Sequence, residues 1–102
     1  MDKLLAIKTF MATVEARGFS AAARKLGVAT SSVTRLVDAL ESELGATLLN
    51  RSTRQVSLTE AGVGYYQRSR EIIQALAEAD ASVADRGEEP VGVLRLCLPV
   101  EF

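Results

Sequence analysis

The side chains of this 102-residue chain that could do chemistry are bases, acids and hydroxyls, because the sequence holds no His and only one Cys. Histidine is the commonest general base and a frequent zinc ligand, so its absence removes most catalytic triads and zinc sites. The remaining Ser, Lys and Asp residues show no arrangement of a nucleophile with a base. We therefore expect no enzyme and no metal site, and the positive charges become the candidates for function.

The positive charge is concentrated in the first part of the chain. Residues 1–59 carry eight basic and five acidic side chains, a balance of +3, whereas residues 60–102 carry four basic and eight acidic ones, a balance of −4. The whole-chain net charge of −1 averages these two parts and hides the asymmetry. Two solvated surfaces of opposite sign would give the same numbers, so charge alone does not identify a partner.

Helical spacing of apolar residues predicts three helices before residue 46. The first ends at Gly18, the second is capped by Ser20, and the third opens on a cluster of hydroxyls suited to an N-cap. Gly27 and Gly45 end the second and third helices. The apolar stripes are Leu4, Ile7, Met11 and Val14 in the first helix, Ala22, Ala23 and Leu26 in the second, and Val33, Val37, Leu40 and Leu44 in the third.

Beyond residue 45 the hydrophobic period changes from helical to alternating. Apolar residues flank a polar stretch that holds Arg51 and Arg54. This pattern predicts a short β-hairpin at about 47–58 with the two arginines at its tip. Two short helices followed by such a hairpin are the layout of a winged helix-turn-helix, in which the hairpin is the wing.

The spacing of three residues supports a helix-turn-helix at about 19–38. Ala23 lies where the two helices would cross, which requires a small side chain. Gly27 lies in the turn, where a positive φ is easy only for glycine. Val33 would anchor the second helix on the first. We therefore expect a mainly α fold over residues 1–59, with three helices and a β-hairpin wing.

Residues 59–86 predict one long linker helix of roughly 42 Å. Two apolar stripes run along it, which indicates two partners: the domain body on one side and a helix of a second subunit on the other. A helix lying over its own core is the alternative. The stripe assigned to dimerisation consists of Tyr65, Ile72, Leu76, Ala79 and Val83, beside a second stripe of Tyr66, Ile73, Ala77 and Ala84.

Residues 87–102 predict a hinge followed by an apolar strand that cannot stand alone. We expect this strand to be the first of a second, truncated domain, with Cys97 as an inert core thiol. No segment predicts a membrane span or a signal peptide. A lone Cys fits a reducing compartment, so we expect a cytoplasmic protein.

Residues 3 to about 64 hold a dense set of motifs: Phe19-Ser20-Ala21-Ala22-Ala23, Leu26 and Val28, Val33-Thr34-Arg35, Leu40-Glu41, Leu44-Gly45, Leu48-Leu49, Arg51 and Arg54, and Leu58-Thr59-Glu60-Ala61-Gly62. Together they resemble the amino-terminal domain of LysR-type transcriptional regulators. The resemblance implies a bacterial regulator that binds double-stranded DNA at an interrupted inverted repeat. It also implies a homodimer through antiparallel long helices, with a tetramer left open for the full-length protein. A small-molecule effector is implied only for the carboxy-terminal α/β domain, so we expect no cofactor in residues 1–102.

The resemblance also assigns the DNA contacts. The recognition helix would enter the major groove, and the wing arginines would approach the minor groove or the backbone. Ser20 would bond a phosphate, and Arg35 has the reach for a guanine edge or a phosphate. The expected DNA-binding residues are Ser20, Thr30, Ser31, Ser32, Thr34, Arg35, Arg51 and Arg54.

The recognition helix departs from the family's frequent Ser-Gln-Pro-Ala-Val-Ser-Arg. Thr30 stands where a long amide is frequent, Leu36 where Gln is frequent and Asp38 where a base is frequent. A carboxylate at Asp38 would be repelled by phosphate or would pair with Arg35. Two other functions stay open: a LysR-like winged helix attached to a different sensor, as in molybdate-responsive regulators, and a winged helix that binds proteins and never touches DNA.

Overall fold

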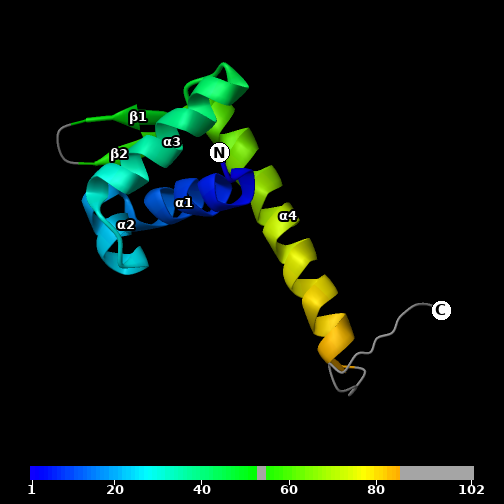
Figure 1. Ribbon diagram of the computed structural model, residues 1–102. Coiled ribbons are helices and arrows are strands. Elements are labelled where there is room, and N and C mark those ends of the chain that lie inside the picture. The colour runs from blue at the N-terminus through cyan, green and yellow to red at the C-terminus, as the bar shows by residue number, and fades with distance from the viewer. Residues whose placement is uncertain (53–54, 86–102) are drawn as a thin grey trace. The chain divides into compact units, whose positions relative to one another are not determined.

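The computed structural model describes residues 1–52 and 55–85. In chain order it shows α1 (Lys3–Ala16), α2 (Phe19–Leu26), α3 (Thr30–Leu44), β1 (Leu49–Arg51), β2 (Val56–Leu58) and α4 (Glu60–Asp85) (Figure 1). The prediction of a mainly α winged helix-turn-helix followed by a long helix is confirmed. The hinge and strand predicted at 87–102, Cys97 and Arg54 lie outside the described residues.

The chain divides into two compact units, Met1–Arg70 and Glu71–Phe102, with the boundary inside α4. The first unit therefore extends beyond residue 59, where the predicted winged domain ends. Within it, α1 packs against α2 and α3, and α2 packs against α3. The strands β1 and β2 pair antiparallel, with Leu49 opposite Leu58 and Arg51 opposite Val56.

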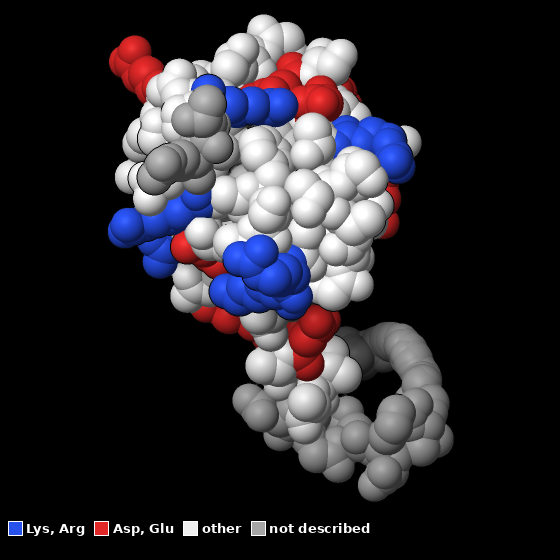
Figure 2. All heavy atoms as spheres, turned by 90° about the vertical axis from the view of Figure 1, so that its left-hand side faces the viewer, with Lys and Arg blue, Asp and Glu red and all other residues white. Residues whose placement is uncertain are grey.

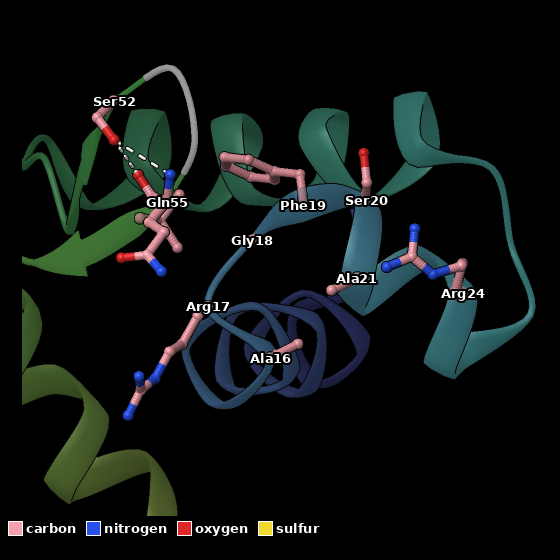
Figure 3. A pocket seen from close by; sticks show the side chains of 10 residues that line it. Ala16, Arg17, Gly18, Phe19, Ser20, Ala21, Arg24, Ser52 and Gln55 are labelled. Carbon is pink, nitrogen blue, oxygen red and sulfur yellow. Dashed lines mark hydrogen bonds between the residues drawn. The ribbon is translucent and has the colours of Figure 1, made fainter.

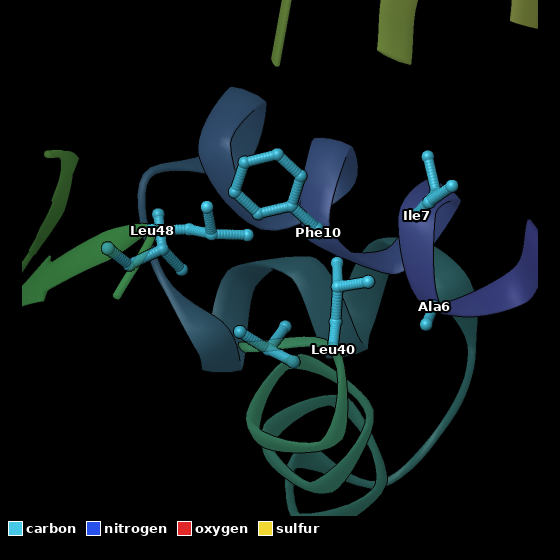
Figure 4. Close-up of a cluster of buried hydrophobic side chains, with 7 residues drawn as sticks. Ala6, Ile7, Phe10, Leu40 and Leu48 are labelled. Carbon is cyan, nitrogen blue, oxygen red and sulfur yellow. The ribbon is translucent and has the colours of Figure 1, made fainter. Parts of the chain in front are cut away.

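The main core of the first unit forms where α1, α3 and the base of the wing meet (Figure 4). Its buried members are Ala6, Ile7, Phe10, Val37, Leu40, Leu48 and Leu49. The rings of Tyr65 and Tyr66 pack against Phe10, with centroid distances of 5.9 and 6.3 Å. Burial of aromatic surface in these contacts stabilises the junction. Tyr65, which the sequence assigned to the dimerisation stripe, thus contacts the core of its own domain.

A second, smaller core holds the helix-turn-helix together. Ala22, Ala23 and Val33 are buried against one another, which confirms the predicted crossing of α2 and α3 at small side chains. The prediction that Leu26 faces inward is wrong, because its side chain is exposed. The short alanines let α2 lie directly on α3, and Leu26, the last residue of α2, lies beyond the contact that they form.

The predicted helix ends are correct at two glycines and wrong at the third. Gly27 and Gly45 adopt left-handed backbones with φ of 73° and 68°. At the end of α1 the left-handed residue is Arg17, with φ of 65°, and Gly18 is extended with φ of 175°. The carbonyl of Arg17 accepts a hydrogen bond from the N–H of Val56 at 3.4 Å. The end of α1 thereby contacts the wing.

The predicted N-caps of α2 and α3 are also corrected. Gly18 is the N-cap of α2, and Ser20 is the second residue of the helix. Ala29 precedes α3, so the hydroxyls Thr30 to Ser32 form its first turn instead of capping it. Neither Gly18 nor Ala29 forms a side-chain cap, and the first N–H groups of both helices are left for other partners.

The wing is joined to α4 by a compact set of hydrogen bonds. The hydroxyl of Thr59 donates to the carbonyl of Thr47 at 2.7 Å and accepts from the N–H of Gly62 at 2.9 Å. The N–H of Thr59 donates to the carbonyl of Leu48 at 2.9 Å. A Cβ at position 62 would overlap that same carbonyl oxygen. The start of α4 therefore lies directly against the backbone that enters β1.

The start of α4 is also bonded to α1. The phenol of Tyr66 donates a hydrogen bond to the carboxylate of Glu15 at 2.9 Å. Burial, together with the hydrogen bond and the negative charge of Glu15, raises the pKa of Tyr66 above its usual value. The neutral phenol is therefore favoured in the folded state, and its contribution to stability is lost only as the pH rises through this raised pKa.

Candidate nucleic-acid interface

The first turn of α3 presents hydroxyls to solvent. Thr30 and Ser31 are exposed and Ser32 is half-buried, and all three precede the buried Val33. The prediction that these hydroxyls lie at the start of the third helix is confirmed. Because a helix N-terminus also carries unpaired N–H groups, this turn can donate hydrogen bonds from both its side chains and its backbone.

One turn further along α3, Thr34 and Arg35 follow Val33. Arg35 is exposed, and Thr34 is half-buried with its hydroxyl donating to the carbonyl of Thr30 at 3.1 Å. The hydroxyl proton of Thr34 is used within the helix, so its oxygen can act towards a ligand as an acceptor. Arg35 keeps a long cationic side chain exposed to solvent.

A pocket opens between the start of α2 and the tip of the wing (Figure 3). Ser20 and Arg24 line it from α2, and Arg17 lines it from the end of α1. In Figure 3 the guanidinium of Arg24 lies across the first turn of α2, while that of Arg17 points away from this helix. On the wing side, the hydroxyl of Ser52 donates to the carbonyl of Gln55 at 2.7 Å and accepts from its N–H at 3.1 Å. The pocket therefore offers the guanidinium of Arg24 and the first N–H groups of α2 to an anion.

The face that holds α2 and the wing is turned to the viewer in Figure 2. Lys and Arg side chains lie at several places around this face, with a broad uncharged area between them. On this face the basic side chains are thus spread out instead of gathering in one compact patch. Such a distribution suits contacts with several phosphates better than the binding of one small anion.

Arg51 is exposed, but its guanidinium is bound by other residues of the same chain. Its Nη2 lies 2.8 Å from an oxygen of Asp38 and 2.8 Å from an oxygen of Glu41, both on α3. Its guanidinium carbon also lies 4.9 Å from the centroid of the Phe19 ring. The predicted pairing of Asp38 with Arg35 is wrong, since the ion-pair partner of Asp38 is Arg51.

Glu41 is the residue at this site that sequence reasoning missed. Its Oε1 accepts from Arg51, and its Oε2 accepts from the backbone N–H groups of Leu48 and Leu49 at 2.8 and 3.1 Å. One carboxylate therefore satisfies two backbone donors at the entry to the wing. The signal in the sequence was the spacing of Asp38 and Glu41, which places both acids on one face of a helix.

The exposed apolar residues of α4 beyond residue 70 match most of the predicted dimerisation stripe. Ile72, Leu76, Ala79 and Val83 are all exposed, whereas Tyr65 is half-buried against Phe10.

Within residues 1–52 and 55–85, no helix is apolar and long enough to cross a membrane. The same described residues hold no cluster of acidic or Cys side chains suited to a metal ion.

Comparison with known proteins gives a consistent set of relatives. Residues 4–63 match the family model described as bacterial regulatory helix-turn-helix protein, lysR family. The HTH-type transcriptional regulator CrgA of Neisseria meningitidis is 46% identical over 90 residues, which are 88% of this chain and 30% of that protein. The HTH-type transcriptional activator AaeR of Escherichia coli is 40% identical over 96 residues, 94% of this chain and 31% of that protein. The chain thus spans about 30% of the length of these relatives.

Solved structures show the same fold. A crystal structure of a BenM_DBD complex with catB site 1 DNA has a TM-score of 0.80 and 30% identity, and the match covers 87% of this chain and 99% of that one. A crystal structure of a CbnR_DBD–DNA complex has a TM-score of 0.78 and 33% identity, and covers 86% of this chain and all of that one. Both structures are complexes with DNA.

Proposed function

We propose that this chain, which belongs to the LysR family of bacterial regulatory helix-turn-helix proteins, binds double-stranded DNA sequence-specifically as the DNA-binding domain of a transcriptional regulator. The observation that carries this proposal is the exposed start of α3. Val33 anchors the helix on Ala22 and Ala23, and the hydroxyls before it and Arg35 after it are directed to solvent. The similarity to two domains solved with DNA supports it.

In this proposal α3 is the recognition helix and lies in the major groove. Its first turn, Thr30 to Ser32, and the side chains of Thr34 and Arg35 would meet base edges or phosphates. Hydroxyls can bond either donors or acceptors on a base, whereas an arginine can make a bidentate pair with guanine. Arg35 therefore carries most of the expected base discrimination.

The start of α2 is the proposed backbone contact. Ser20 and Arg24 line the pocket at this helix N-terminus, where N–H groups and a positive helix dipole favour a phosphate. Arg54, at the predicted wing tip, is proposed as a groove contact from its sequence position alone. Contacts of this kind fix the register of α3 on the duplex without reading the sequence.

We further propose a homodimer. The support is the exposed row Ile72, Leu76, Ala79 and Val83 on α4, whose spacing suits pairing with another helix. A two-fold dimer would read two half-sites, which predicts an interrupted inverted repeat in the DNA. Binding of a small-molecule effector is proposed only for the carboxy-terminal domain that the resemblance implies. We also propose a cytoplasmic location, which suits such a regulator.

Neither alternative is favoured by the comparisons. A different sensor, such as that of molybdate-responsive regulators, has no support in a set of relatives named as LysR-type and other HTH-type regulators. A module that binds only proteins is not supported either, because the similar domains were solved on DNA. The named relatives are regulators, so we propose no enzymatic activity for the chain.

Affinity selection from a random pool of duplex DNA tests the sequence specificity. The full chain should enrich a recognisable motif over successive rounds, and the motif should contain a repeated half-site if the chain dimerises. The enriched duplex and a scrambled duplex of the same composition then serve as the two probes for variants. A pool that stays random after repeated rounds would contradict sequence-specific binding.

A further inference from the structure

We propose that Arg51 is a positioning residue, which fixes the wing to the recognition helix, and that it does not neutralise a DNA phosphate. This inference rests on the proposed function, because it concerns how the DNA-reading elements are held. We call the group formed by Asp38, Glu41, Arg51 and Phe19 the wing clamp. Its members come from α2, α3 and β1, so one guanidinium joins the three elements that frame the interface.

The first support is that both neighbouring carboxylates use the same guanidinium nitrogen. Nη2 of Arg51 lies 2.8 Å from Oδ1 of Asp38 and 2.8 Å from Oε1 of Glu41. The two acids are three residues apart on α3 and therefore share one face of the helix, where their charges would repel each other without a cation between them. Arg51 supplies that cation.

The second support is the full use of the Glu41 carboxylate. Its other oxygen accepts the N–H groups of Leu48 and Leu49, and its side chain is only 15% exposed. A carboxylate this shielded requires partners, and charge-assisted bonds of this length are the stronger kind. Glu41 therefore ties the backbone just before and at the start of β1 to α3, and Arg51 completes its hydrogen bonding.

The third support is the charge balance. Arg51 adds one positive charge to two negative ones, so the wing clamp as a whole is negative. The Arg51 side chain is 34% exposed, and its outer neighbour Asp38 is 54% exposed. A phosphate approaching Arg51 would meet the Asp38 carboxylate beside it, and breaking the clamp would uncover Glu41. Binding DNA through Arg51 would therefore cost more than leaving it in place.

The fourth support is the contact with Phe19. The guanidinium carbon lies 4.9 Å from the ring centroid, within the range of a cation–π interaction. Phe19 is the first residue of α2, next to Ser20 in the pocket. The orientation of the wing, the start of α2 and the middle of α3 thus all depend on the same planar group, which a lysine cannot replace in shape.

The test compares Arg51→Lys and Arg51→Ala on the selected and scrambled duplexes over a range of salt concentrations. Both variants should lower the ratio of affinities for the selected and the scrambled duplex by about tenfold, a loss equivalent to one good base contact. The reason is that the wing is no longer fixed to α3. The slope of log affinity against log salt should stay as in the wild type. If Arg51 contacted a phosphate, Arg51→Ala would instead reduce the slope by about 0.9. Arg51→Lys, which keeps the positive charge, would then keep the wild-type slope. That pattern would overturn the proposal.

The two carboxylates provide a matched pair of variants. Glu41→Gln should reproduce the loss of preference seen in Arg51→Lys, because it weakens the bonds to Leu48 and Leu49 as well as to Arg51. Asp38→Asn removes only the exposed partner and should change the preference by less than about threefold, in keeping with the small worth of exposed ion pairs. Equal effects of the two variants would overturn the assignment of Glu41 as the central partner.

A measurement without DNA separates this proposal from the proposed function. Amide hydrogen exchange at Leu48 and Leu49 in the free protein should speed up about tenfold in both Arg51→Lys and Glu41→Gln. In both variants the side chain at position 41, which accepts these two N–H groups, is no longer fixed by Arg51. The amides of the α1 interior report whether the variants remain folded. Unchanged exchange at both leucines would refute the wing clamp even if the chain binds DNA. Faster exchange in a chain that has no affinity for DNA would confirm the wing clamp and refute only the proposed function.

Discussion

Replacing Gly62 by alanine should lower the free energy of unfolding by about 3 kcal/mol, because the added methyl group has no room. A Cβ at this position would overlap the carbonyl oxygen of Leu48 and lie 3.0 Å from both its carbonyl carbon and a methyl of Leu58. The carbonyl cannot move cheaply, since it accepts the N–H of Thr59 at 2.9 Å. The start of α4 must therefore shift away from the wing.

Gly64 provides the matched control, two residues along the same helix. An added Cβ there meets no atom within 4 Å. Gly64→Ala should therefore raise the unfolding free energy by about 0.5–1 kcal/mol, the gain expected for alanine over glycine inside a helix. Thermal unfolding at equal protein concentration measures both variants, and Gly62→Ala should melt about 12 °C or more below the wild type. Equal melting temperatures for the two variants would show that α4 does not lie against Leu48.

Replacing Arg35 by alanine should weaken binding to the selected duplex by about 10- to 100-fold, the worth of one bidentate pair with a base. Binding to the scrambled duplex should weaken by only about threefold, because a general electrostatic contribution is all that is lost there. The physical reason is the position of Arg35, which is exposed two residues after the anchoring Val33.

Lys3→Ala is the control for loss of a positive charge. Lys3 forms an ion pair with Glu43 at 3.1 Å, at the far end of α3 from Arg35. Its removal should change the affinity for either duplex by less than about twofold, as expected for an exposed pair. Fluorescence anisotropy of labelled duplexes measures all three proteins. Equal losses on both duplexes would make Arg35 a backbone contact, and no loss on either would remove α3 from the interface.

Local patterns predicted the fold well where a single residue decides a conformation. Gly27 and Gly45 have the positive φ that their positions in the sequence indicated, and Ala23 with Val33 forms the predicted crossing. The end of α1 was assigned to Gly18 because glycine is the usual left-handed residue. Arg17 takes that conformation instead, and its carbonyl bonds the N–H of Val56 in the wing. A contact between segments so far apart leaves no periodic signal.

For the candidate site, the structure bears on the exposure and the partners of the predicted residues, and the partners are what the sequence did not predict. Arg35, Thr30 and Ser31, which the sequence proposed as DNA contacts, are exposed, whereas Ser32 and Thr34 are half-buried. The sequence placed Arg51 and Asp38 in separate roles, whereas the structure pairs them and adds Glu41. Periodicity shows which face of a helix a residue occupies. It does not show which cation of another element comes to lie against that face.

The central property proposed for this chain is the binding of duplex DNA by exposed residues of α2 and α3. A titration of the wild-type chain against a random-sequence duplex at about 50 and 200 mM salt measures it most directly. The account predicts saturable binding that weakens by at least about tenfold over this range, as phosphate contacts release their counterions. Absence of binding at the lower salt concentration, or an affinity that does not change with salt, would contradict the account.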